Sequence, residues 1–327
     1  MALKSLGLKY EHLWASEKQS AYRKIFEATH PDCAVVFHDM TSRPTEALEM
    51  ARKRQNQLLL YCAGWPCQPY SGAGLQQGEA DARSKPVWAV LLAIEIARPD
   101  LVLLENVPPF IESGKFRKIA KECIDFLMSI GNGAYYVDWQ VLDAYTHGGV
   151  PASRSRVYII ATRKDRIVKP WQWPTPIPAP GLTQFLEPRA ATSVADVKGR
   201  LDGMNITGLR NLDAAMRLIP KKWPGKDAAR DCFVVDLKNS EQFGPQVSYD
   251  KFSTITKSHA GDLWLTHLQD RARPSEVLAA QGFQRSSVRT PAGCTDKHLY
   301  EMAGNAFCVP VVTRIFRAVL PALGYPM

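Results

Sequence analysis

A cysteine on a glycine-rich loop and a glutamate further along the chain are the side chains best suited to chemistry. Cys67 lies in the stretch Gly64 to Gly74, which reads GWPCQPYSGAG, and Glu105 begins the triplet Glu-Asn-Val. A cysteine thiolate can form a covalent bond as a nucleophile. A carboxyl group nearby can bind the same ligand or exchange a proton with it.

Two short apolar runs are predicted to position these residues. Residues 57–62 form a predicted buried strand that stops at a Gly, a Pro and then Cys67. Residues 99–104 form a second predicted buried strand, which ends at Glu105 and Asn106. Because ligands of open α/β sheets bind at the carboxyl ends of the strands, we expect these side chains to face one crevice.

These motifs, taken with three further blocks, resemble the cytosine-5 DNA methyltransferases. The resemblance covers nearly the whole chain, and the blocks occur in the order found in the family. They are Pro66 to Gln68, Glu105 to Val107, Gly149 to Pro151 with Arg154 to Arg156, Glu276 to Phe283, and Gly304 to Ala306. The implied fold class is α/β, with a Rossmann-like S-adenosylmethionine-dependent methyltransferase sheet and a second, smaller target recognition domain.

The resemblance implies transfer of a methyl group from S-adenosylmethionine to carbon 5 of cytosine in DNA. Cys67 would add to carbon 6 of the ring, because the ring alone is too weak a nucleophile. Glu105, in its protonated form, would bind ring nitrogen 3 and the exocyclic amine. Arg154 and Arg156 complete the predicted catalytic set, with Arg156 on the exocyclic oxygen. The base must be flipped out of the duplex to reach them.

Five residues are predicted to bind the cofactor, also from the resemblance. Glu17 would hold the ribose hydroxyls and Asp39 would contact the adenine amino group, while Gly64, Pro66 and Asn305 would border or close the pocket. Two of these have simpler explanations: Glu17 opens a predicted helix running to about residue 28, and Gly304-Asn305 alone is an ordinary turn.

A further set of five residues is predicted to bind the substrate: Gln68, Ser71, Arg83, Asn106 and Gln281. Arg83 belongs to an Asp-Ala-Arg-Ser segment that resembles the family's Asp-x-Arg-Gly, in a polar stretch that could close over a substrate. Without its flanking motifs this stretch would be read as plain surface. The helix that starts at Pro274 and carries Gln281 is expected to pack the domains together.

Two departures from the family pattern stand out. Ala152 occupies the place of a family glutamine. The family's opening strand and Phe-x-Gly-x-Gly loop would fall just before Ala2, so we expect this cofactor-binding element to be missing. A truncated sequence, a complementary chain that supplies the loop, or an inactive relative would each account for this.

The chain is predicted to have three parts. Residues 1–164 form the catalytic domain, 165–268 the target recognition domain, and 269–327 a segment that returns to the catalytic domain. A proline-rich linker of residues 170–180 opens the middle part. Its candidate readers of base edges are Lys221, Lys222, Trp223 and Lys226, which could instead contact the DNA phosphates or only water.

The composition excludes several classes of protein. The net charge of +9 suits a polyanion such as double-stranded DNA without demonstrating it. Seven cysteines with no Cys-x-x-Cys pair argue against a disulfide framework or a structural metal. Without a secretory apolar core or membrane span, we expect an intracellular protein, cytoplasmic in bacteria or phage and nuclear in eukaryotes.

Two alternative functions stay open. One is an inactive or split-enzyme DNA-binding subunit that needs a partner chain. The other is a tRNA cytosine-5 methyltransferase, since that branch shares every motif used above. Competition between DNA and RNA substrates would distinguish the tRNA methyltransferase from a DNA methyltransferase.

Overall fold

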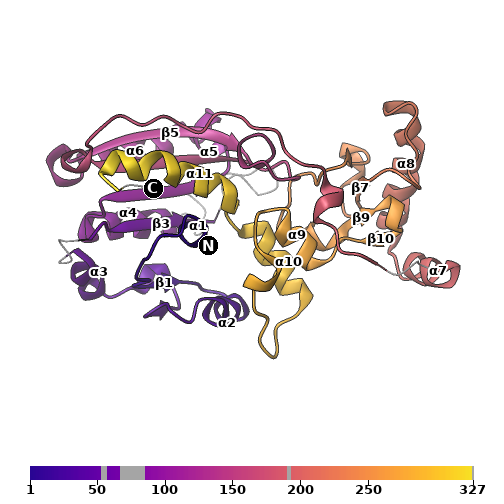
Figure 1. The fold of residues 1–327 in the computed structure, drawn as a ribbon, viewed down its shortest axis with the longest axis horizontal. Helices are drawn as coiled ribbons and strands as arrows, with labels where there is room; N and C mark the ends of the chain where they lie inside the picture. The colour runs from indigo at the N-terminus through magenta and orange to yellow at the C-terminus, as the bar shows by residue number, and fades with distance from the viewer. Residues whose placement is uncertain (53–56, 67–84, 190–192, 326–327) are drawn as a thin grey trace. The chain divides into compact units, whose positions relative to one another are not determined.

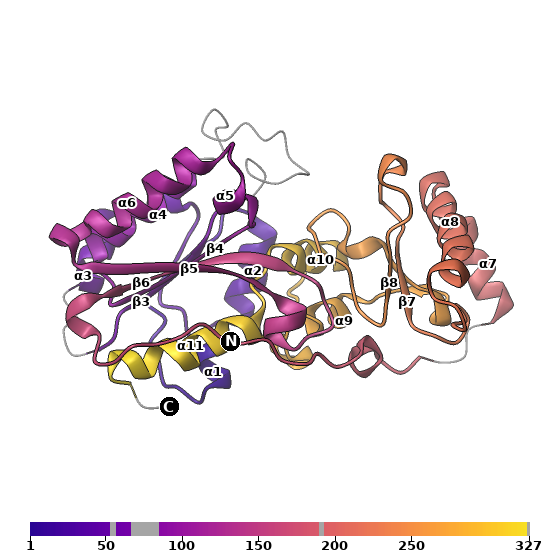
Figure 2. The same ribbon diagram turned by 90° about the horizontal axis from the view of Figure 1, so that it is seen from above.

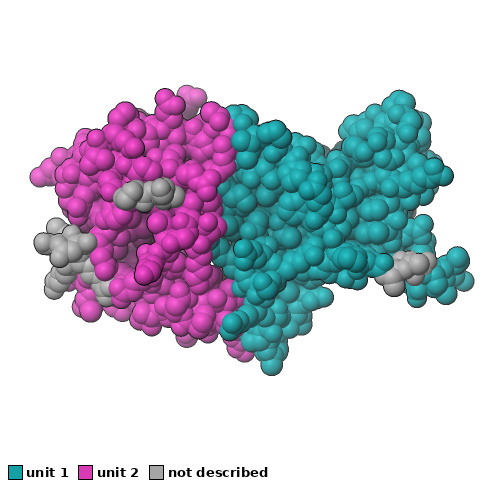
Figure 3. Space-filling view, in the orientation of Figure 1, with its two compact units in different colours: residues 1, 143–154, 176–312 teal, residues 2–142, 155–175, 313–327 magenta. Residues whose placement is uncertain are grey.

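The computed structural model describes residues 1–52, 57–66, 85–189 and 193–325. The chain divides into two compact units, coloured separately in Figure 3. Unit 1 contains Met1, Asp143–Arg154 and Pro176–Val312. Unit 2 contains Ala2–Leu142, Ser155–Thr175 and Thr313–Met327. Neither unit is a continuous piece of chain.

Unit 2 is built on a four-stranded mixed sheet with the order β3-β4-β6-β5. These strands are β3 (Leu60–Gly64), β4 (Leu101–Asn106), β6 (Ser155–Arg163) and β5 (Tyr135–Asp143). β3 pairs with β4 in parallel, whereas β6 pairs with β4 in the antiparallel direction. All six residues of β4 are buried, as expected for a continuous apolar run between covered faces.

Helices cover both faces of this sheet, as Figures 1 and 2 show. α4 (Lys85–Ala97) and α6 (Arg117–Gly133) lie on one face, next to α5 (Pro109–Glu112). α1 (Ala2–Ser5) and the later part of α11 (Val309–Val319) lie on the other. α6 is amphipathic, and Cys123 on its buried side packs into the core as the sequence predicts.

A second, small sheet in unit 2 consists of β1 (Ala15–Ser16) and β2 (Val36–Phe37), which pair in parallel. α2 (Ser20–Thr29), α3 (Thr45–Arg52) and a short 3₁₀ helix (Met40–Ser42) surround it. In the described residues, β1 and β3 belong to separate sheets. Side chains connect them instead. The ring centroids of Trp14, just before β1, and Tyr61, in β3, lie 5.6 Å apart. The Arg43 guanidinium stacks on the Trp14 ring, 4.9 Å from its centroid.

Unit 1 contains a four-stranded antiparallel sheet with the order β10-β9-β7-β8. Its strands are β7 (Phe233–Asp236), β8 (Val247–Tyr249), β9 (Leu263–Leu265) and β10 (Asp270–Arg271). Its helices are α7 (Val194–Asp202), α8 (Ile206–Lys222), α9 (Pro274–Ala279) and α10 (Asp296–Asn305), with a π-helical turn at Ala144–Gly148. Further 3₁₀ helices in the chain are Lys164–Arg166, Leu182–Phe185, Glu241–Phe243, Ala260–Asp262, Thr266–Leu268, Arg285–Ser287 and Leu320–Leu323.

The compact units do not follow the predicted domain boundaries. Residues 269–312 lie in unit 1 with the middle part of the chain, so only 313–327 return to unit 2. The connection between β5 and β6, residues 143–154, also lies in unit 1. The roles assigned to the three predicted domains stay predictions.

One stretch, Asp296–Leu323, is long and apolar enough to cross a membrane by composition. Half of its most apolar window is buried inside the structure, and α10 ends at Asn305 before α11 begins at Val309. The stretch is therefore two separate helices, and only α11 is strongly apolar along its buried side.

Candidate active site

Glu105 and Arg156 form a largely buried ion pair at one end of the sheet in unit 2. Because β6 runs antiparallel to β4, it begins where β4 ends, and Glu105 lies opposite Tyr158. Arg156 therefore enters at the end of β4, with its Nε 3.0 Å from Glu105 Oε1. Each side chain is only 10% exposed. The pairing of the strands thus brings together two of the four predicted catalytic residues.

Asn106 ties the ends of β3 and β4 to each other. It is 2% exposed, and its Nδ2 donates to the Trp65 carbonyl at 3.4 Å, while its Oδ1 accepts from the Val107 amide at 2.8 Å. Gly64 lies opposite Glu105 in the parallel register, so Gly64 and Pro66 reach the same edge of the sheet. Asn106 thereby fixes the backbone at Trp65, two residues before Cys67. We had predicted Asn106 only as a substrate contact, so this structural role is additional.

Four predicted residues lie outside the described residues: Cys67, Gln68, Ser71 and Arg83. The preceding Trp65 is 5% exposed and packs edge-on against Phe110, with ring centroids 5.2 Å apart. This contact anchors the start of the segment that carries Cys67.

Glu17 and Asp39 follow neighbouring strands, because β1 and β2 pair in parallel with Ser16 opposite Phe37. Glu17 accepts a hydrogen bond from the Gln19 amide at 2.8 Å, so it also supports the start of α2. Asp39 accepts from the Thr41 amide at 2.9 Å and pairs with Lys18 at 2.9 Å. The Thr41 amide, and then Lys18, lower the pKa of Asp39 to about 2.

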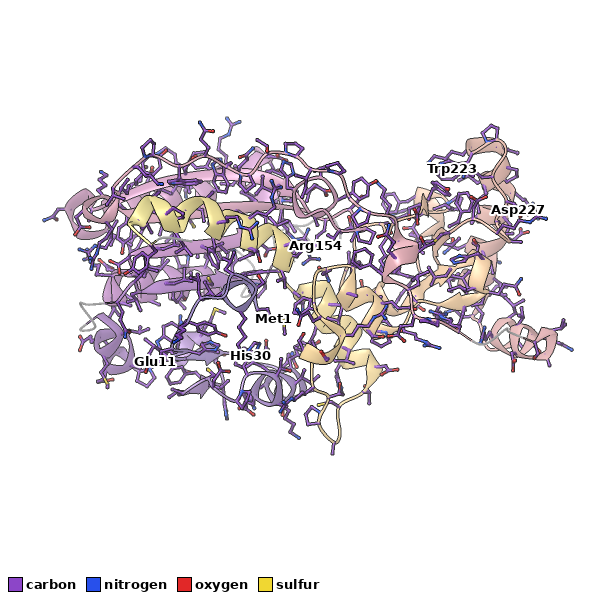
Figure 4. All side chains as sticks on the ribbon, viewed as in Figure 1. Met1, Glu11, His30, Arg154, Trp223 and Asp227 are labelled. Atoms are coloured by element: carbon purple, nitrogen blue, oxygen red, sulfur yellow. The ribbon has the colours of Figure 1, made fainter. Side chains whose placement is uncertain are left out.

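Arg154 lies in unit 1 and holds backbone there. Its Nη1 donates to the Ile255 carbonyl at 2.7 Å and to the Gly304 carbonyl at 3.0 Å, and the residue is 3% exposed. Figure 4 shows its position beside the C-terminal helices. The two arginines of the predicted catalytic set therefore take different partners, since Arg156 pairs with Glu105 in unit 2.

Gln281 and Asn305, also in unit 1, differ sharply in exposure. Gln281 is fully buried; its side-chain Nε2 donates to the Ala303 carbonyl, and its backbone carbonyl accepts from the Val309 amide at 3.0 Å. In this position Gln281 packs the start of α11 against α10, and its contact with a substrate stays a prediction. Asn305 is exposed and is the last residue of α10, where we had expected a loop.

The sequence interpretation did not find the pair of Asp236 and His259 in unit 1. The Asp236 Oδ2 and His259 Nδ1 atoms lie 2.6 Å apart. Asp236 ends the apolar strand β7 just as Glu105 ends the apolar part of β4, so the same rule could have found it. For metals, the described part of the chain contains no group of three His, Cys, Asp or Glu side chains that could hold an ion.

Comparison with known proteins identifies the family. The model of the C-5 cytosine-specific DNA methylases matches residues 1–320. This chain belongs to that family. Among its relatives, the methylase is 31% identical over 268 residues to the type II methyltransferase M.Bsp6I of Bacillus sp., a match that covers 77% of this chain and 76% of the relative. It is 28% identical over 333 residues to M.HpaII of Haemophilus parainfluenzae, covering 99% and 86%.

The fold of the methylase is also found in solved structures. Dnmt2 methyltransferase of S. pombe superimposes with a TM-score of 0.64 at 18% identity, and the match covers 99% of this chain and 95% of that one. The predicted α/β fold class with a sheet of the S-adenosylmethionine-dependent methyltransferase type is confirmed, and the role of the smaller part in target recognition stays a prediction.

Proposed function

We propose that this chain transfers a methyl group from S-adenosylmethionine to carbon 5 of cytosine in double-stranded DNA. Membership of the C-5 cytosine-specific DNA methylases supports this reaction. The observation that carries it is the Glu105–Arg156 pair at the carboxyl end of β4, beside the Gly64–Pro66 segment that leads into Cys67.

The pair suits one edge of a cytosine ring, which offers an exocyclic amine, ring nitrogen 3 and an exocyclic oxygen. Glu105 would bind the amine and nitrogen 3, and Arg156 the oxygen, where negative charge gathers. A neighbouring arginine favours the ionised form of a carboxyl group. When Arg156 turns to the base oxygen, Glu105 becomes easier to protonate and can donate to nitrogen 3.

The cofactor would supply an electrophilic methyl group when bound. Glu17 and Asp39 fit such a ligand because both follow parallel strands at the same edge of the small sheet. Lys18 already pairs with the Asp39 carboxylate, so a contact from Asp39 to an adenine amino group would compete with this ion pair.

We also propose that a complementary chain supplies a strand between β1 and β3. The two strands belong to separate sheets, although Trp14 and Tyr61 hold them near each other. Figure 3 shows a recess on this face of unit 2. Saturable one-to-one binding of S-adenosylmethionine by this chain alone would contradict the need for an added strand.

The decisive experiment measures transfer of tritiated methyl groups to unmethylated genomic DNA. Cys67→Ala should abolish the transfer while DNA binding is kept. Cys62→Ala is the matched control, because it removes a thiol from β3 that is not placed in the reaction. Where the Cys62→Ala control transfers methyl groups, transfer by Cys67→Ala at the same rate would contradict the proposal. Adding an excess of unlabelled tRNA tests the RNA alternative, since a true DNA methylase keeps its rate.

A further inference from the structure

A buried carboxylate orients an imidazole in unit 1, away from the candidate active site. Asp236, 4% exposed, ends β7, and its Oδ2 lies 2.6 Å from His259 Nδ1. Its other oxygen accepts from the Lys238 amide at 2.9 Å. Because an ionised carboxylate can only accept, Nδ1 of His259 carries the hydrogen and Nε2 points away from Asp236.

The segment that ends at His259, residues 253–259, is held at several points although it has little regular structure. The Arg154 guanidinium holds the Ile255 carbonyl, and Lys238 Nζ donates to the Ser258 carbonyl at 3.0 Å. The backbone of Lys257 lies so close to Gly304 that a Cβ there would be 2.1 Å from the Lys257 nitrogen. The segment is therefore fixed before any ligand binds, which is how a recognition element lowers the entropy cost of binding.

The imidazole of His259 is partly exposed to solvent. The side chain is 30% exposed, whereas its carboxylate partner is 4% exposed. Buried acids that serve to orient a histidine are typical of sites where the other ring nitrogen acts on a ligand. A pair that served only to stabilise the fold would be more stable with the imidazole fully buried than with part of it in solvent.

The charges around the imidazole favour its protonated form. The hydrogen bond that His259 donates to Asp236 is the largest effect and raises the pKa of His259. Lys238, which follows β7, opposes this effect, and Asp262 of the neighbouring 3₁₀ helix supports it. A larger fraction of His259 is therefore cationic near neutral pH than for a histidine in water, and its Nε2 then donates.

We propose that His259 is a DNA-contacting residue that donates a hydrogen bond from Nε2 to an acceptor atom of the bound duplex. This rests on the proposed function, in which DNA is the substrate. Two acceptors share the required chemistry: O6 or N7 on the edge of a guanine, and a phosphate oxygen. The first would make His259 a specificity-determining residue and the second a residue that sets affinity.

The test compares His259→Asn with His298→Asn. An asparagine Nδ2 can occupy the place of the histidine Nδ1, so His259→Asn keeps the bond to Asp236 and loses only the Nε2 donor. His298, also in unit 1, accepts from the Thr295 amide at 3.0 Å within its own helix and serves as the control. The assays are fluorescence anisotropy with a labelled random-sequence duplex from pH 6 to 8.5, and bisulfite sequencing of methylated genomic DNA.

We expect His259→Asn to bind DNA about tenfold more weakly than the wild type at pH 6. The affinity of the wild type for DNA should fall as the pH rises, and that of the variant should fall less. A smaller slope of log affinity against log salt, by about one, identifies a phosphate contact. Methylation that becomes tolerant of other bases at one position identifies a base contact.

Affinity, pH profile and methylated motif all equal to those of the wild type would overturn the role of His259. Wild-type protein that binds DNA but transfers no methyl group would count against the proposed function only, because the anisotropy comparison still tests His259. No salt-dependent binding of DNA by the wild type would overturn both.

Discussion

Replacing Gly304 by alanine should destabilise unit 1, because the added methyl group has no room. An ideal Cβ at Gly304 would lie 2.1 Å from the Lys257 nitrogen, 2.4 Å from its Cα and 2.4 Å from the Thr256 carbonyl carbon. All three are backbone atoms, so no flexible side chain can move aside. Arg154 holds this arrangement from the other side through the Ile255 and Gly304 carbonyls.

The size of the effect follows from these contacts. Relief of the overlap needs a backbone displacement of roughly 1 Å, and overpacking of this kind costs about 1–3 kcal/mol. The displacement also strains the two hydrogen bonds of Arg154, each worth about 1 kcal/mol. The expected loss in the free energy of unfolding is therefore about 3–5 kcal/mol, which corresponds to a melting temperature lower by roughly 6–20 °C.

Urea denaturation and calorimetry of Gly304→Ala and Gly199→Ala provide the assay. Gly199 lies within α7, and a Cβ there meets nothing within 4 Å, so its replacement should leave stability unchanged or raise it by up to about 1 kcal/mol. If Gly304→Ala melts within about 2 °C of the wild type, the contact between Gly304 and the 256–257 backbone is not as described.

Three further predictions concern charged groups. Glu276→Gln should lower the free energy of unfolding by about 3 kcal/mol in urea titrations, because Glu276 is fully buried and pairs with Arg189 at 2.6 Å. The lowered pKa of Asp39, about 2, means that its ionised form contributes stability above about pH 4 that is lost as the pH falls toward 2. Thermal melts of Asp39→Asn should therefore change less between pH 5 and pH 2.5 than those of the wild type, and parallel curves would argue against this. Arg156→Lys should keep the melting temperature within a few degrees but lower methyl transfer about a hundredfold, since lysine lacks the planar guanidinium; wild-type rates would remove Arg156 from the proposed reaction.

Much of unit 2 could be predicted because its strands are short apolar runs that end in polar residues. The run at 99–104 becomes β4, two residues later than expected, and Glu105 and Asn106 lie at its end as predicted. The approach of Arg156 to Glu105 could not be read from the pattern itself. It depends on β6 being antiparallel to β4, which is a property of the topology and not of either segment.

Unit 1 was harder to predict because its contacts are distant in sequence. The motif that contains Arg154 gives no sign that its partners are the Ile255 and Gly304 carbonyls. Gln281 looked like a polar residue available to a ligand, yet its amide is used within the core. α8 was missed altogether, since its apolar residues are diluted by basic ones and a proline near its end. Figure 4 marks Trp223 and Asp227 in the turn that follows it.

The discontinuity of the two units limits how this protein could be re-engineered. After Met1, the chain passes between the units at residues 142–143, 154–155, 175–176 and 312–313. A fragment of residues 176–312 would lack Arg154, and with it the anchor of the 253–259 segment. An exchange of unit 1 between two methylases should therefore include two stretches, 143–154 and 176–312, because a single-segment exchange would separate the 253–259 segment from its support.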